Sequence, residues 1–282
     1  MGRYFSIVTC RNSESEIEKA INSLLKQTIK PRYIIVVDDG STDNTPNILN
    51  QLKSKNDNIY VITNPDLGYD IGRVVKNWNS AINLARDFKL EKTDYHMIST
   101  DDTQYEEFYA EKIMRKMDED KIIAISSGNY DNNSYATPHG AGRFVRNSFF
   151  DSVLGHYPEK MGYESVILQM SLYLGFKNLV NNDARFSHTR QLGSNHHFYE
   201  FGASMRTLGY HPLFVLGRFM QCFLTGKPIG RMGAIQMLYY YLSYKPKQVG
   251  YDSMYDPEIR QAIRIRQKTR IKQIFRLRNT NT

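Results

Sequence analysis

Short apolar runs alternate with stretches of helical period through the first hundred residues. Four runs have the composition of buried strands: residues 4–10, 32–39, 58–64 and 95–100. Three stretches with apolar residues at helical spacing lie between them: residues 13–28, 45–55 and 71–88. Because these connections are too long for hairpins, the pattern predicts an α/β fold, a Rossmann-like, mostly parallel sheet with helices on both faces.

Polar clusters follow three of these predicted strands, at the point where each strand ends: Thr9–Arg11, Asp38–Asp39 and Asp101–Asp102. The carboxyl ends of parallel strands meet at one edge of a sheet, and ligands bind there near the switch point of strand order. The three clusters therefore predict a binding site at this edge.

The pattern loosens after about residue 121. Residues 121–130 read as another strand, and 142–150 and 164–176 look helical. A Tyr-rich apolar stretch, residues 229–244, then precedes a basic tail. We expect a first domain over 1–210, which carries the predicted site, and a helical extension over 211–282.

The net charge of +8 is concentrated in that tail, because residues 258–278 carry eight Lys or Arg against one Glu. Cys10 and Cys222 lie far apart without a CxxC or Cys/His pattern, so we expect a reducing compartment and no disulfide framework or zinc site. The chain shows no signal-peptide pattern and no apolar run of about 18 residues. These features favour the cytoplasm.

Each acidic pair has two interpretations. Asp38 and Asp39, in "VVDDGSTD", could form only an Asp-Gly turn, or their carboxylates could accept hydrogen bonds from a nucleobase and a ribose. Asp101 and Asp102, in "MISTDDTQY", could cap a helix or lie in a solvated loop. Alternatively, their oxygens suit a hard divalent cation that bridges a diphosphate.

Several motifs together resemble family 2 glycosyltransferases with the GT-A fold, of the bacterial and archaeal type that assembles polysaccharides or other glycans. They are "FSIVTCRNSE", "IIVVDDGSTDNT", "KNWNSAI" and "STDD", in the order and spacing of that family, and the likeness continues through "GYES" and "HTRQLGS". The resemblance covers nearly the whole chain, and "DDGSTD" is its most specific part.

The resemblance implies a role for each matching residue. Thr9, Arg11 and Asp39 would line the nucleoside pocket, with Asp38 nearby. Asp101 and Asp102 would form the DXD-type site for Mn²⁺ or Mg²⁺ and the donor sugar, with Asp102 the preferred metal ligand.

Three further positions complete the implied site, with some departures from the family pattern. Where many relatives have Arg-Asn, this chain has Trp78-Asn79, so phosphate contact would pass to Lys76 or Arg73. His188 would complete the metal shell or touch the diphosphate, or else be structural, and Arg190 would add a phosphate contact. His139, His196 and His197 are interpreted as loop residues.

Inverting sugar transfer also requires a carboxylate that takes the proton of the acceptor hydroxyl. The family's Glu-Asp pair is Glu164-Ser165 here, which makes Glu164 the candidate base and Asp183 the second choice. The alternative for Glu164 is a first-turn glutamate that complements the helix dipole.

The basic tail also allows more than one interpretation. Apolar residues at helical spacing, surrounded by Lys and Arg, are typical of a helix on an anionic membrane surface, but an ordinary solvated helix fits as well. Nucleic-acid binding is a third possibility, which the acidic strand ends disfavour because they would repel a polyanion.

We therefore expect a metal-assisted inverting glycosyltransferase, peripheral on the inner face of the cell membrane. Its partners would be a UDP- or GDP-type sugar donor and a glycan or lipid-linked acceptor, with no nucleic acid. A nucleotide-sugar binder without transferase activity is the alternative.

Overall fold

The computed structural model describes residues 1–130, 137–190 and 198–279, with side chains to residue 273. The chain divides into two compact units, the first made of residues 1–158 and 175–191 and the second of 159–174 and 192–282. These units follow a different boundary from the one predicted at residue 210. The assignment of catalytic and extension roles to 1–210 and 211–282 stays a prediction.

The first unit is built on an eight-stranded sheet with the strand order β3-β2-β1-β4-β7-β6-β8-β5. Its parallel part confirms the prediction from the alternating pattern: β1 (Tyr4–Cys10), β2 (Ile34–Asp38), β3 (Ile59–Thr63) and β4 (Tyr95–Thr100). The chain passes from β1 outward to β3 and then returns to place β4 on the other side of β1. The order of strands therefore switches between β1 and β4.

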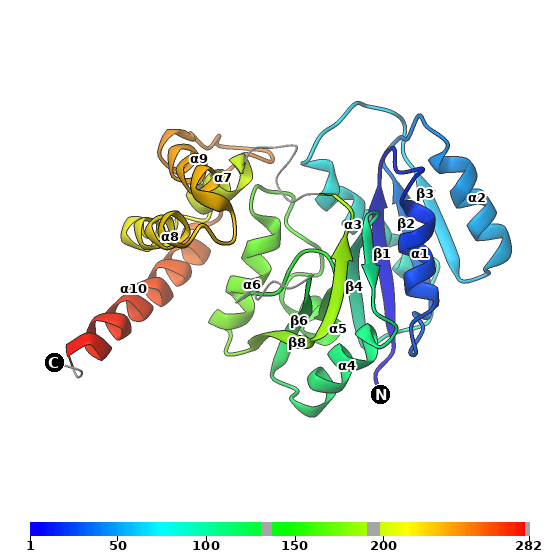
Figure 1. Ribbon diagram of the computed structural model, residues 1–282, viewed down its shortest axis with the longest axis horizontal. Helices are drawn as coiled ribbons and strands as arrows, with labels where there is room; N and C mark the ends of the chain where they lie inside the picture. The colour runs from blue at the N-terminus through cyan, green and yellow to red at the C-terminus, as the bar shows by residue number, and fades with distance from the viewer. Residues whose placement is uncertain (131–136, 191–197, 280–282) are drawn as a thin grey trace. The chain divides into compact units, whose positions relative to one another are not determined.

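Helices cover both faces of this sheet (Figure 1). On one side lie α1 (Ile17–Leu25), α2 (Thr45–Lys55) and α4 (Tyr109–Glu119), whose apolar residues join one core cluster. On the other lie α3 (Arg73–Asp87) and α5 (Asn147–Val153). Trp78 of α3 is 2% exposed and packs edge-on against Tyr157.

The second half of the sheet contains the antiparallel pairings: β5 (Thr103–Tyr105), β6 (Ile123–Tyr130), β7 (Arg143–Arg146) and β8 (Lys177–His188). The helix predicted over residues 142–150 is wrong in its first half. Residues 143–146 form β7, which pairs with both β4 and β6 and buries Phe144 and Val145 completely. Sheet pairing on both sides outweighs the local preference, and the helix begins only at Asn147.

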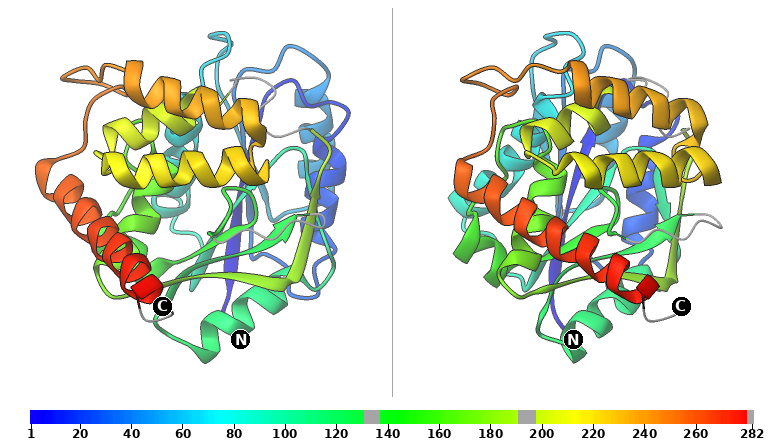
Figure 2. Two further views of the ribbon diagram at one scale, coloured as in Figure 1. Left: turned by 60° about the vertical axis from the view of Figure 1, so that its left-hand side comes forward. Right: turned by 90° about the vertical axis from the view of Figure 1, so that its left-hand side faces the viewer.

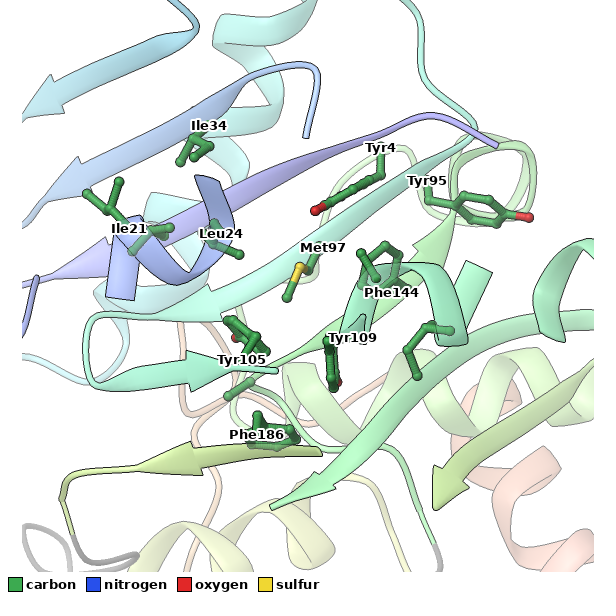
Figure 3. Packing of buried hydrophobic residues seen from close by; sticks show 14 of the residues in the cluster. Tyr4, Ile21, Leu24, Ile34, Tyr95, Met97, Tyr105, Tyr109, Phe144 and Phe186 are labelled. Carbon is green, nitrogen blue, oxygen red and sulfur yellow. The ribbon is translucent and has the colours of Figure 1, made fainter. Parts of the chain in front are cut away.

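A continuous cluster of large side chains fills the space between the sheet and the helices α1, α2 and α4. Figure 3 shows Met97 and Phe144 of the sheet near Tyr109 of α4, and Tyr4 and Tyr95 belong to the same cluster. Burial of each such side chain contributes about 1.5–3 kcal/mol. Gly128 allows this packing, since a Cβ there would overlap the carbonyl oxygen of Ala184 and the ring of Tyr109.

The second unit consists of helices: α6 (Tyr163–Tyr173), α7 (Tyr199–Thr207), α8 (Pro212–Thr225), α9 (Gly230–Ser243) and α10 (Pro257–Asn279). The helix predicted over 164–176 and the helical tail are thus confirmed. A core of its own joins residues from these helices, among them Val166, Leu208, Val215 and Met237. Within the described parts of the chain, no helix is both long and apolar enough to cross a membrane.

Candidate active site

The carboxyl ends of β1, β2 and β4 lie next to one another, as the polar clusters predicted. Thr9 is the register partner of Thr100 in β4, and Cys10 is the partner of Asp38 in β2. All three clusters therefore lie at one edge of the sheet, and two of them flank the switch point between β1 and β4.

Asp38 closes the turn that follows β2. The residue is fully buried, and its Oδ1 accepts hydrogen bonds from the backbone N–H of Ser41 at 3.0 Å and from the Ser41 hydroxyl at 2.6 Å. Gly40 supplies the positive φ of 74° that this turn requires. This is the geometry of a turn-forming aspartate, and the contact of Asp38 with a nucleoside stays a prediction.

Asp39 faces cations instead. Arg73 Nε lies 3.0 Å from both of its carboxylate oxygens, and Arg11 donates hydrogen bonds to the carbonyls of Asp39 and Gly40. Arg11 also forms a 2.7 Å ion pair with Asp66. Two guanidinium groups thus converge on this loop, where they could meet a phosphate or order a nucleoside pocket.

The sequence pointed to either Lys76 or Arg73 as the phosphate-contacting cation of this helix. In the structure Arg73 contacts Asp39, whereas Lys76 is exposed one turn further along α3. Arg73 and Lys76 are three residues apart on one helix, so the sequence alone did not distinguish between them. The contact of Lys76 with a phosphate remains a prediction.

Asp101 is the inner member of the second acidic pair. Its carboxylate accepts a hydrogen bond from the Ser13 hydroxyl and forms an ion pair with Arg190. Burial raises the pKa of Asp101, and the positive charge of Arg190 opposes that rise. A hollow of about 150 Å³, lined in part by Asn12, Ser13 and Arg190, lies beside this group.

Asp102 is the outer member and the more acidic one. His188 Nδ1 lies 3.4 Å from its Oδ1, Thr100 donates a 2.7 Å hydrogen bond to the same oxygen, and Arg190 Nε is 3.4 Å from Oδ2. Burial raises the pKa of Asp102, but the contacts with His188, Thr100 and Arg190 outweigh it and lower the pKa to about 2. Asp102 is therefore ionised at neutral pH.

The pairing of β5 with β8 brings His188 to this position, because Thr103 and His188 are register partners. An ionised carboxylate with an imidazole nitrogen beside it is a suitable donor set for a divalent cation that takes its other ligands from phosphate and water. Within the described residues, no group of three or more His, Cys, Asp and Glu side chains is arranged around one point as a metal site. The residues fit a cation whose coordination a bound diphosphate completes.

Glu164 begins the first turn of α6 in the second unit and is half-buried there. Glu200 of α7 lies close enough for the charge of Glu164 to act on it, and the Tyr251 hydroxyl is 3.4 Å from its Oε1. Burial first, and then the charge of Glu164, raise the pKa of Glu200 to about 7. Sequence reasoning missed Glu200, and nothing in its local pattern distinguishes it from a surface glutamate.

Other predicted residues have plain outcomes. Asp183 is exposed on β8, and His139 lies in a loop as expected. His196 and His197 lie outside the described residues.

A model of the family described as glycosyl transferase family 2 matches residues 6–166. The chain belongs to this family. The match includes every predicted site residue except three that lie beyond it: the alternative base Asp183, His188 and Arg190.

Curated relatives match parts of this family 2 chain. Hyaluronan synthase of Pasteurella multocida is 21% identical over 211 residues, which are 70% of this chain and 21% of that protein. An uncharacterized glycosyltransferase of Mycoplasma genitalium, MG060, is 35% identical over 91 residues, 32% of this chain and 28% of that protein. The chain thus spans only about a fifth to a quarter of these relatives' length.

Solved structures share the fold and confirm the GT-A expectation. The mannosyltransferase PcManGT from Pyrobaculum calidifontis, in complex with GDP-Man and Mn²⁺, has a TM-score of 0.60 at 15% identity, covering 86% of this chain and 70% of that one. TarS 1-349 of S. aureus in complex with UDP-GlcNAc has a TM-score of 0.54 at 19% identity, covering 85% and 71%.

Proposed function

We propose that this family 2 chain transfers a sugar from a nucleoside diphosphate sugar to an acceptor hydroxyl. The observation that supports this most directly is the cluster at the end of β4, where Asp102 is held ionised beside His188 and Arg190. Structures with the same fold are described as complexes with GDP-Man and Mn²⁺ and with UDP-GlcNAc. The donor is therefore of the GDP or UDP type.

Thr9, Arg11 and Asp39 bind the nucleoside in this proposal, while Arg73 keeps the Asp39 carboxylate in place. Asp102 and His188 would hold Mn²⁺ or Mg²⁺, with Asp101 behind them. The cation, when bound, neutralises the charge that develops on the departing diphosphate. Arg190, which is half-exposed, adds a positive charge at the same place.

Transfer proceeds with inversion at the anomeric carbon. Glu164 takes the proton of the acceptor hydroxyl while that oxygen forms the new bond to the anomeric carbon. The bond from the anomeric carbon to the diphosphate oxygen breaks at the same time, and the nucleoside diphosphate leaves with the electron pair. The departing diphosphate contacts Arg190.

The acceptor that we propose is a glycan or a lipid-linked oligosaccharide. α10 carries the excess of Lys and Arg, and Ile265, which is 55% exposed, adds an apolar side chain to its surface. A basic helix of this kind is attracted to anionic lipid, which would keep the enzyme peripheral on the inner face of the cell membrane.

Thermal shift with UDP, GDP and their sugar derivatives, with and without Mn²⁺, tests donor binding. A specific donor at about 100 times its Kd stabilises the folded chain by about 2.7 kcal/mol and raises the Tm by several degrees. Asp102→Asn should remove the part of the Tm increase that depends on Mn²⁺. Asp57→Asn, at an exposed position, serves as the control. A shift that neither EDTA nor Asp102→Asn changes would reject the metal assignment.

Glu164→Gln tests the catalytic step separately. Transfer should fall by about 10²–10⁴-fold while the donor-induced shift persists, because loss of a general base affects the chemical step alone. Near wild-type turnover would exclude Glu164 as the base. Donor binding by the wild type without turnover of any acceptor would favour the non-catalytic binder.

A further inference from the structure

An exposed apolar stripe runs along α8. Its residues recur at intervals of three and four, which place them on one face of the helix: Leu213, Leu216, Met220 and Leu224. Val215 and Cys222, on the opposite face, are buried in the core of the second unit. The helix is therefore apolar on the side that faces away from its own core.

A matching stripe runs along α9, formed by Met232, Ile235, Tyr239 and Leu242. The residues of both stripes are exposed, from 43% at Ile235 to 67% at Leu242. The buried residues of α9, Ala234, Met237 and Tyr241, again occupy the opposite face.

The two stripes belong to one surface. α8 and α9 lie side by side (Figure 2), and both bury their inner faces in the same cluster. Their exposed faces both point away from this cluster, and together they carry eight large apolar side chains. A soluble monomer rarely exposes a contiguous apolar patch larger than a few hundred Å², so a surface of this kind marks an interaction site.

The segment that carries this surface has charges of one sign, and a carboxylate pairs with it at its end, where Asp252 contacts Lys247. Residues 201–251 contain no Asp or Glu, and they include six cations: Arg206, Arg218, Lys227, Arg231, Lys245 and Lys247. A second copy of the chain would bring the same positive charge against it and be repelled. An anionic surface that accepts apolar side chains is the complementary partner.

The lengths of these helices exclude a spanning arrangement. α8 and α9 have 14 residues each, or about 21 Å at 1.5 Å per residue, whereas a spanning helix needs about 20 residues. Helices with apolar faces and basic surroundings lie in the plane of the membrane, with the apolar face about 5–10 Å deep.

We propose that the paired outer faces of α8 and α9 form a membrane-docking surface that inserts its two apolar stripes into an anionic lipid layer. This inference deepens the membrane location proposed above for α10 and rests on it. It adds an apolar contact to the electrostatic one, so the enzyme is held at the surface where a lipid-linked acceptor is presented.

Co-sedimentation of the whole protein with vesicles tests the surface without donor or acceptor, so its outcome is independent of sugar transfer. The vesicles contain phosphatidylcholine alone or equal parts of phosphatidylcholine and phosphatidylglycerol. Wild type should bind the anionic vesicles and keep part of this binding at high salt, because apolar insertion is not screened. Binding through α10 alone would disappear at high salt.

Leu216→Ser should weaken binding about tenfold and the double variant Leu224→Ser/Leu242→Ser about a hundredfold, since each removes a leucine from the apolar contact. Leu174→Ser is the matched control, because Leu174 and Leu216 are both 48% exposed but Leu174 lies outside the stripes. All substituted positions are exposed, and unchanged circular dichroism melts verify folding. Equal binding by wild type and the double variant would overturn the proposal, as would a wild-type dimer that dissociates in the variant without any vesicle binding.

Discussion

Glu200 should make the second unit less stable as the pH rises through neutrality. Burial, supported by the charge of Glu164, raises its pKa from the ordinary 4.5 to about 7. Between these values the unfolded chain has released the proton that the folded chain retains. The stabilisation is therefore complete below about pH 4.5 and is lost as the pH rises through about 7.

The size of the effect follows from the pKa shift. A rise from 4.5 to about 7, at about 1.36 kcal/mol per pKa unit, corresponds to about 3 kcal/mol between pH 4.5 and a pH well above 7. This is a substantial part of the free energy of unfolding of a typical folded domain, which is roughly 5–15 kcal/mol. Glu200→Gln, which cannot ionise, should lack this dependence.

Amide hydrogen exchange of the α7 segment is the suitable assay, because the only tryptophan, Trp78, lies in the other unit. After correction for intrinsic exchange, the opening free energy of wild type should fall by about 2.5 kcal/mol more than that of Glu200→Gln between pH 5 and pH 8. Glu258→Gln, at an exposed position in the same unit, should behave as wild type. Parallel pH profiles for wild type and Glu200→Gln would refute a protonated, buried Glu200.

Two further substitutions test the first unit. Arg73→Ala should lower the free energy of unfolding by about 2 kcal/mol, because it leaves the nearly buried Asp39 carboxylate without its ion pair. Lys76→Ala, at an exposed position of the same helix, should change the free energy of unfolding by less than about 0.5 kcal/mol. Urea denaturation followed by Trp78 fluorescence measures both, and equal effects would contradict the pairing. Gly128→Ala should cost about 2–3 kcal/mol in the same assay, since the added methyl group overlaps backbone, and a neutral result would show that the strand can shift.

The parallel half of the sheet could be predicted because its signals are local. Strands β1, β2 and β4 are almost completely buried, so each is a near-continuous apolar run, and the helices between them have clear apolar stripes. The antiparallel half has no such signal. β7 is only four residues long and is specified by its two neighbours, β4 and β6.

The candidate site divides in the same way. Residues directly after predicted strands were found from the sequence because the topology of parallel sheets brings strand ends together. The position of His188 depends on the β5–β8 pairing, and the family resemblance, not its spacing, pointed to it. Glu200 could not be found, because its raised pKa comes from burial between helices and not from neighbouring residues in the sequence.

The two acidic pairs share one physical division of roles. In each pair, the first aspartate is more buried and holds the local structure: Asp38 closes the turn through Ser41, and Asp101 accepts a hydrogen bond from Ser13. The second aspartate of each pair contacts a cation: Asp39 contacts Arg73, and Asp102 contacts Arg190, which also pairs with Asp101.

This division bears on the choice of metal ligand between Asp101 and Asp102. Burial disfavours the charged form of Asp101 and raises its pKa, and the Asp101 carboxylate is already paired with Arg190. Asp102 has a pKa of about 2 and is fully ionised without any cation. Asp102 also lies beside His188, a second possible ligand, whereas Asp101 is engaged by Ser13 and Arg190. We therefore expect Asp102 to be the direct ligand in the proposed site, with Asp101 fixing Ser13 and Arg190 around it.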